Sequence, residues 1–228
     1  KKKPPYGLYV PKVGICEDLT EYKKLIKFNS KNPTVGVLLY GGMHFEDTKP
    51  IADALYEKFS DELNFIFVYS NVEYNLEAVK KYFDNIDLFL NCQYFRIHGG
   101  PYGGEPEPTY ELLQKLDVPV LIGLRTYDLD IDKWEKSNEG LDTLHTILGV
   151  TLPELDGCIE PNLIALLKTE EDLTLGKVKS VVVLEDRVTK LAKRIKNWIN
   201  LRRKQNSDKK VAIITYNYPP GEENLASA

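Results

Sequence analysis

The segment 152–161 reads LPELDGCIEP and holds three carboxylates within seven residues, on Glu154, Asp156 and Glu160. Prolines and apolar side chains bracket them, so they could form a partly desolvated acidic cluster. Carboxylates with raised pKa values act as general bases, and their oxygens bind hard cations. On the pattern alone, a solvated turn built on Asp156 and Gly157 is the favoured interpretation.

Three further loops carry groups suited to holding a ligand. They span residues 41–44, 93–104 and 125–127, and each follows an apolar run that predicts a strand. In open α/β sheets, ligands collect beyond the carboxyl ends of the strands. We therefore name Arg96, His98 and Arg125 as candidate ligand-binding residues.

The same loops bear on metal and nucleotide sites. None of them matches GxGxxG or GxxxxGKS/T, so the sequence predicts no nucleotide site. The histidines form no HxH or HExxH cluster, and no firm metal site is predicted. His98 is the residue for which a metal-ligating role stays open, whereas His145, in a predicted helix, is expected to be structural. The glycine-rich stretch 99–104 is typical of a mobile surface loop.

The composition describes a globular chain, since 43% of its 228 residues are hydrophobic. With 34 acidic against 30 basic residues the net charge is -4, which does not favour a nucleic acid as partner. Cys16, Cys92 and Cys158 lie far apart, so we expect three free thiols in a reducing compartment. No apolar run approaches the roughly 18 residues needed to cross a bilayer. Because the start also lacks a signal peptide, we expect a cytoplasmic protein without a transmembrane segment.

Short β-rich apolar runs alternate with helical patterns along the chain. This order predicts an α/β fold of the Rossmann or flavodoxin-like type, with helices on both faces of a parallel sheet. Nearly continuous apolar runs predict parallel strands in flavodoxin-like order over residues 35–40, 65–69, 87–91 and 118–124. Helical spacing predicts helices over residues 48–59, 76–83 and 108–116.

The rest of the chain predicts a helical excursion after residue 125 that returns to a strand near residues 158–165. Apolar spacing predicts a helix over residues 186–204 with Trp198 facing inward, and residues 211–216 read as a buried strand. We divide the chain into a lead-in segment (1–33), an α/β domain (34–185), a connecting helix and linker (186–210) and the truncated start of a further α/β domain (211–228).

Four stretches resemble, in order, motifs of the family of large chelatase subunits that comprises cobaltochelatase CobN and the magnesium chelatase H protein. The segment 152–161 resembles its ALPELDGGIEP signature, and upstream Trp134, Ser137, Gly140 and Leu141 resemble WxxSxxGL. Residues 187–204 are similar to its RVxxLxxRxxxWxxLRRK helix, and residues 210–220 to KxVAIxxYNYPP. The chain is thereby identified as an internal fragment of the large tetrapyrrole-binding subunit.

The resemblance implies insertion of a divalent metal, Co²⁺ or Mg²⁺, into a tetrapyrrole in cobalamin or (bacterio)chlorophyll biosynthesis. It also implies AAA+ ATPase partner subunits that hold ATP and Mg²⁺, no cofactor on this chain, and an inactive isolated fragment. Carboxylates suit removal of pyrrole protons and transfer of a cation. Glu154 and Glu160 thereby become candidate catalytic residues, and Asp156 a candidate ligand-binding residue. The loop 94–98 is bulkier and more polar than its counterpart in the family, which weakens the transfer of any role to His98.

Two other functions remain open on the sequence. The chain could be a structural domain that docks the AAA+ partners while the active site lies elsewhere in the large subunit. It could also be an independent sensor of the periplasmic-binding type, against which the missing signal peptide counts.

Overall fold

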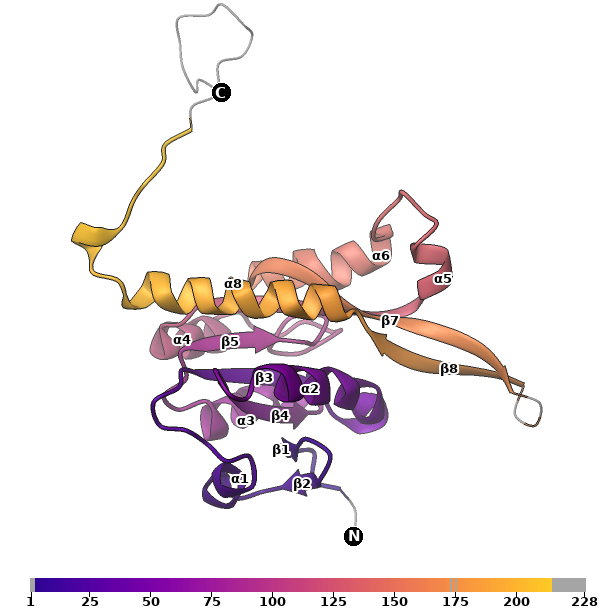
Figure 1. The fold of residues 1–228 in the computed structure, drawn as a ribbon, viewed down its shortest axis with the longest axis horizontal. Helices are drawn as coiled ribbons and strands as arrows, with labels where there is room; N and C mark the ends of the chain where they lie inside the picture. Colours follow the sequence, from indigo (N-terminus) through magenta and orange to yellow (C-terminus); the bar gives the residue numbers. More distant parts are fainter. Residues whose placement is uncertain (1–2, 173, 175, 215–228) are drawn as a thin grey trace, which may run out of the picture.

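One mixed sheet of eight strands organises the computed structural model, which describes residues 3–172, 174 and 176–214 (Figure 1). The strand order is β2-β1-β4-β3-β5-β6-β7-β8. The strands are β1 (Tyr6–Val10), β2 (Gly14–Cys16), β3 (Thr34–Tyr40), β4 (Asn64–Ser70), β5 (Leu88–Asn91), β6 (Val120–Asp130), β7 (Ile159–Asp172) and β8 (Gly176–Val183).

Helices and single turns connect the strands. The α-helices are α1 (Leu19–Leu25), α2 (Phe45–Phe59), α3 (Asn75–Tyr82), α4 (Glu107–Leu116), α5 (Ile131–Trp134), α6 (Thr143–Thr146), α7 (Leu152–Leu155) and α8 (Glu185–Arg203). The 3-10 turns are η1 (Gly42–His44), η2 (Val72–Tyr74) and η4 (Asn206–Asp208), and η3 (Ile147–Thr151) is a π-helical turn between α6 and α7.

Five neighbouring strands, β4-β3-β5-β6-β7, are parallel. Numbered along the chain among themselves, they follow the order 2-1-3-4-5, which is the flavodoxin-like order. The predicted α/β class and parallel core are therefore confirmed. Antiparallel strands β1 and β2 extend one edge, and β8 pairs antiparallel with β7 in a hairpin that projects beyond the sheet (Figure 1).

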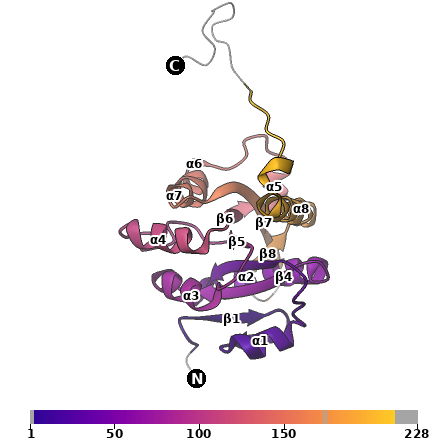
Figure 2. The same ribbon diagram turned by 90° about the vertical axis from the view of Figure 1, so that its left-hand side faces the viewer.

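Helices cover both faces of the sheet. Figure 2 shows α3 and α4 on one side and α8 on the other. Along β3 the side chains alternate: Leu38 and Tyr40 pack into the core under α3, while Val37 and Leu39 pack into the core under α2 and α8. Because successive side chains point to opposite faces of a strand, both faces of β3 lie in apolar surroundings, as its continuous apolar run predicts.

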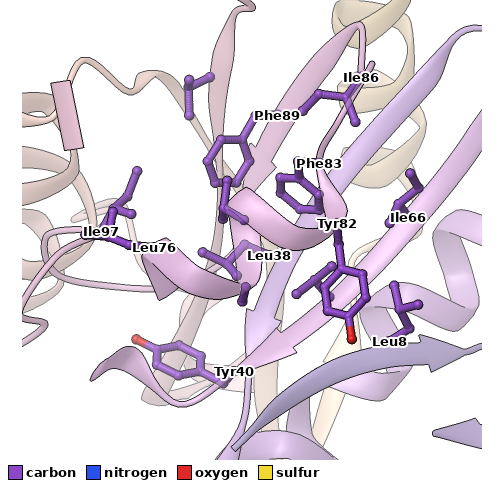
Figure 3. Close-up of a cluster of buried hydrophobic side chains, with 14 of the residues drawn as sticks. Leu8, Leu38, Tyr40, Ile66, Leu76, Tyr82, Phe83, Ile86, Phe89 and Ile97 are labelled. Atoms are coloured by element: carbon purple, nitrogen blue, oxygen red, sulfur yellow. The ribbon is translucent and has the colours of Figure 1, made fainter. Parts of the chain in front are cut away.

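The core under α3 depends on one close approach. Phe83 packs edge-to-face on Phe89, with ring centroids 5.1 Å apart (Figure 3). A Cβ atom at Gly36 would come within 2.9 Å of the Phe83 ring, so only glycine lets this ring lie directly on β3.

The inward face of α8 differs from the prediction. Val188, Leu191, Ile195 and Ile199 are buried against the sheet, while Trp198 is half-buried at the edge of this stripe. Ile199 follows Ile195 by four residues and so continues the buried row, while Trp198 packs against the same core only with part of its side chain. The prediction that Trp198 faces inward was therefore wrong in part.

The strand predicted over residues 211–216 does not form in its described part. Residues 211–214 have no regular structure, and the side chains of Val211, Ile213 and Ile214 are exposed, because no strand pairs with them. Residues 215 and 216 lie outside the described residues. The domain boundaries remain predictions, although residues 6–16 join the sheet through β1 and β2 and α8 packs on one of its faces.

Cys16, Cys92 and Cys158 are all buried and free, as predicted. Burial raises the pKa of Cys92 and of Cys158 to about 12, so both thiols stay protonated and unreactive. Among the described residues, every helix is too short or too polar to cross a membrane.

Candidate functional site: an aromatic pocket at the sheet's carboxyl edge

The carboxyl ends of β3, β5 and β6 meet at one edge of the sheet. Chain order reverses between β3 and β5, because β4 lies on the far side of β3. This switch point is where open α/β sheets bind ligands. A cavity of about 310 Å³ lies there, which we call the aromatic pocket. It is lined by Tyr40, His44, Tyr94, Phe95, Tyr127, Asp128, Leu144, His145 and Leu148.

Tyr127 is the central ring of the aromatic pocket. Its centroid lies 4.9 Å from that of Tyr94, 5.5 Å from that of His44 and 6.1 Å from that of Tyr40, all in edge-to-face contact. The Tyr94 amide donates to the Tyr40 hydroxyl over 2.6 Å, which ties the loop after β5 to the end of β3. Burial raises the pKa of Tyr40, Tyr94 and Tyr127, so the phenols stay neutral and the wall carries no phenolate charge.

Arg125 lies behind this wall. Its side chain is 3% exposed, and its guanidinium carbon lies 4.4 Å from the centroid of the Tyr127 ring. Nη1 contacts the Asp47 carboxylate at 3.4 Å, but the buried Nη2 has no hydrogen-bond partner among the described residues. A guanidinium stays charged when it is buried, and an unpaired buried donor costs free energy. Nη2 of Arg125 can therefore still donate a hydrogen bond to an anionic or carbonyl acceptor.

Two predicted site residues, Arg96 and Asp156, bind each other. Arg96 Nε donates to Asp156 Oδ1 over 2.6 Å, and the Ile97 amide donates to Asp156 Oδ2 over 2.6 Å. The Asp156 side chain is completely buried. This ion pair fastens the loop after β5 to the turn after α7, so the structure supports a positioning role for both residues.

The two glutamates of the predicted acidic cluster point to different surroundings. Glu154 is exposed on α7. Glu160 is the second residue of β7 and forms an ion pair with Arg194 of α8, with Arg194 Nε 2.7 Å from Glu160 Oε2. The hydrogen bond from Arg194 lowers the pKa of Glu160. The expectation of a raised pKa was therefore wrong for Glu160, because a cation faces it in place of a second carboxylate. Neither glutamate lines the aromatic pocket.

His98 lies in the loop after β5, with Nδ1 3.0 Å from the carbonyl oxygen of Glu105. A different histidine has acidic neighbours. His145, predicted to be structural, is buried, and one ligand atom each from His145, Asp128 and Asp142 lie within 4.8 Å of one another. Within the described residues, this is the one group of three or more His, Cys, Asp or Glu side chains with metal-ligand spacing.

Sequence reasoning missed Tyr40 and Tyr94 as pocket residues and missed the acidic neighbours of His145. One signal was present in the sequence: Tyr40 ends the apolar run of β3, Tyr94 follows β5 closely, and Tyr127 follows the apolar part of β6. A second was the spacing of Asp142 and His145, since Asp142 is the N-cap of α6 and its side chain accepts from the His145 amide over 3.0 Å.

A groove of about 550 Å³ lies at the opposite end of β6, beside Val120 and Trp198. Two of its charged groups, on Asp117 and Arg202, contact each other at 3.3 Å on the surface. Although this groove is larger, it lies at the amino ends of the parallel strands, away from the switch point. We therefore place the candidate site in the aromatic pocket.

The fold and the pocket together define a flavodoxin-like α/β protein with a candidate ligand pocket at the switch point of its sheet. More specifically, the chain belongs to the CobN/Magnesium Chelatase family, whose family model matches residues 1–228. The predicted family membership is therefore confirmed.

Individual relatives agree with this assignment. The chain is 31% identical over 233 residues to the uncharacterized protein MJ1441 of Methanocaldococcus jannaschii, covering 95% of this chain and 18% of that protein. It is 32% identical over 150 residues to the H protein of the magnesium chelatase of Chlorobaculum parvum, covering 64% of this chain and 11% of that protein. The catalytic subunit of cobaltochelatase from Mycobacterium tuberculosis shares the fold, with a TM-score of 0.67 at 22% identity over 95% of this chain and 17% of that protein.

The chain spans between 10% and 20% of the length of the curated relatives that it matches.

Proposed function

We propose that this chain is a domain of the large subunit of a metal chelatase and that its aromatic pocket holds one edge of a tetrapyrrole during metal insertion. The observation that carries the proposal is an apolar pocket walled by aromatic rings at the switch point of the sheet, in a chain of the CobN/Magnesium Chelatase family. In this proposal Co²⁺ or Mg²⁺ is the substrate metal, and ATP hydrolysis on separate AAA+ subunits drives its insertion.

The pocket suits a flat conjugated ring. Tyrosine and histidine rings offer stacking and edge-to-face contacts to a π-system, and their restrained positions lower the entropic cost of binding. A macrocycle of four pyrrole rings exceeds a cavity of about 310 Å³, so the pocket would take one edge of it and leave the centre accessible to a metal.

Metal insertion also needs a base for the pyrrole protons. Glu154, exposed on α7, remains a candidate for this role. Glu160 is the weaker base of the two, because the hydrogen bond from Arg194 holds its pKa below the usual range.

Absorbance titration of the chain with a porphyrin and with a corrin precursor, in the absence of metal, tests the proposal. We expect a shift of the main absorption band for one of the two macrocycles. Tyr127→Leu, which keeps an apolar side chain but removes the central ring, should weaken binding about tenfold, as roughly 1.4 kcal/mol of lost ring contact implies.

Tyr102→Leu is the matched control, because Tyr102 is 97% exposed and lies outside the pocket. Unchanged spectra for both macrocycles, or equal weakening by the two substitutions, would refute a tetrapyrrole site in this chain. Either result would favour the alternative of a structural domain that docks the AAA+ subunits.

A further inference from the structure

A second cavity adjoins the aromatic pocket along the carboxyl edge of the sheet. Its volume is about 300 Å³, and we call it the glycine cavity because Gly41 and Gly42 lie in its wall. The rest of the wall comes from the ends of β3 and β4, from the turns η1 and η2 and from the loop after β5. The aromatic pocket lies over the ends of β3, β5 and β6, so the two cavities together span four neighbouring strands.

Three aromatic residues, Tyr40, His44 and Phe95, line both cavities. The rings of Tyr40 and His44 are in edge-to-face contact, with centroids 5.8 Å apart. The His44 side chain is 41% exposed and Phe95 is half-buried, so the shared wall reaches the surface. Aromatic rings offer favourable contacts to a flat conjugated ligand that lies on them. The wall therefore divides the two cavities but gives such a ligand a continuous surface.

The shared wall is held in place by the loops on either side of it. Phe95 has a φ of +68°, which is an uncommon conformation for a bulky residue, and its amide donates to the Leu148 carbonyl oxygen over 2.8 Å. On the other side, a Cβ atom at Gly41 would lie 2.6 Å from Asn71 Oδ1, so only glycine lets the start of η1 approach the end of β4. Because both sides are fixed, a ligand meets walls that are already formed, which lowers the entropic cost of binding.

Each cavity also includes an apolar side chain that solvent reaches. Met43 lines the glycine cavity and is 87% exposed, while Leu144 lines the aromatic pocket and is 60% exposed. Exposed apolar side chains that border adjoining cavities are typical of a surface that a ligand covers. A flat ligand across the shared wall would cover both side chains, and their burial would favour its binding.

We propose that the two cavities form one site, in which a single flat macrocycle lies across Tyr40, His44 and Phe95 with one of its rings over each cavity. The ligand class is a conjugated polycycle of the size of a tetrapyrrole, because a molecule of one or two rings would fit into either cavity alone. The inference rests on the proposed function for the identity of this ligand as a tetrapyrrole. It adds that two pyrrole rings are held, so the outer face of the macrocycle stays open to an approaching metal ion.

Titration with metal-free macrocycles tests whether the two cavities act as one site. The probes are deuteroporphyrin IX and, in parallel, the metal-free corrinoid hydrogenobyrinic acid, each followed by its absorption band. We expect one macrocycle per chain for the probe that binds. Two independent cavities would instead give a stoichiometry of two.

Substitutions at the two exposed side chains locate the ligand over both cavities. Met43→Ser and Leu144→Ser should each weaken binding about fivefold, since each removes apolar surface that the ligand would bury. The double variant should weaken binding about 25-fold, because the two losses multiply when one ligand contacts both side chains. Leu155→Ser is the matched control, since Leu155 is 54% exposed and lines neither cavity. Circular dichroism melting checks that each variant is folded.

Two macrocycles per chain, or a loss by Met43→Ser no larger than that by Leu155→Ser, would overturn the single site. If only Leu144→Ser weakened binding, the macrocycle would occupy the aromatic pocket alone, and the proposed function would stand without this inference. Unchanged spectra with both probes would remove the tetrapyrrole site itself and the inference with it.

Discussion

The guanidinium groups of Arg96 and Arg125 differ in how completely they are paired. The Arg96 guanidinium is paired with Asp156, whose second oxygen is also satisfied, by the Ile97 amide. Arg125 is more deeply buried, but its Nη2 has no partner among the described residues. An unsatisfied buried donor costs about 1–3 kcal/mol. The unpaired Nη2 therefore lowers the stability of the fold behind the wall of the aromatic pocket.

We expect the ion pair between Arg96 and Asp156 to contribute to the free energy of unfolding. Asp156→Asn keeps the shape of the side chain but leaves the Arg96 charge without its counter-ion, so we expect the free energy of unfolding to fall by about 3–5 kcal/mol. Urea denaturation measures the change. Glu62→Gln, which removes an exposed partner of Lys196, should cost less than about 1 kcal/mol. A loss no larger than that of Glu62→Gln would show that the buried pair contributes little.

At the scale of elements, the parallel strands were predictable and the edge strands were not. Strands β3, β4 and β5 bury every side chain, so their continuous apolar runs mark them in the sequence. Strand β8 is exposed over most of its length and has no such run. The extension of β6 past Leu124 was also missed, because it carries polar residues into the pocket where the sheet ends.

The candidate site was predictable only as a region. Strand ends located the loops with Arg96, His98 and Arg125, because ligand sites follow from sheet topology. The partners of these residues were not predictable, since Arg96 and Asp156 are 60 positions apart and meet only through the order of the strands. Likewise, the position of His145 in a helix says nothing about Asp128, which reaches it from β6.

Substitutions on α8 can test which of its faces packs on the sheet. Ile199 is 2% exposed against the sheet, so Ile199→Ala leaves a cavity and should lower the free energy of unfolding by about 2–4 kcal/mol. Leu201→Ala, on the same helix at a side chain that is 46% exposed, should cost less than about 1 kcal/mol. Chemical denaturation of both variants measures the difference. Equal losses would mean that α8 does not pack on the sheet as described.

For the whole molecule, the sheet is a platform that brings distant segments to one edge. The walls of the aromatic pocket come from the loops after β3 and β5, from the extension of β6 and from the segment α6–η3. Helix α8 covers a face of the sheet and lines no part of the pocket. Changes in the loops can therefore alter the ligand while the packing of the sheet stays the same.

Because the sheet and the pocket form only part of a chelatase, we expect no metal insertion by this chain alone. The sequence holds neither GxGxxG nor GxxxxGKS/T, and the chain spans 10–20% of the length of its curated relatives, so the energy source and the rest of the macrocycle site would come from elsewhere. Incubated with tetrapyrrole, Co²⁺ or Mg²⁺, and ATP, the chain alone should bind ligand but form no metallated product above the uncatalysed rate. Absorption spectra of the macrocycle distinguish the free from the metallated form. ATP-dependent product would show that this chain contains a complete chelatase, in contradiction to the proposed division of labour.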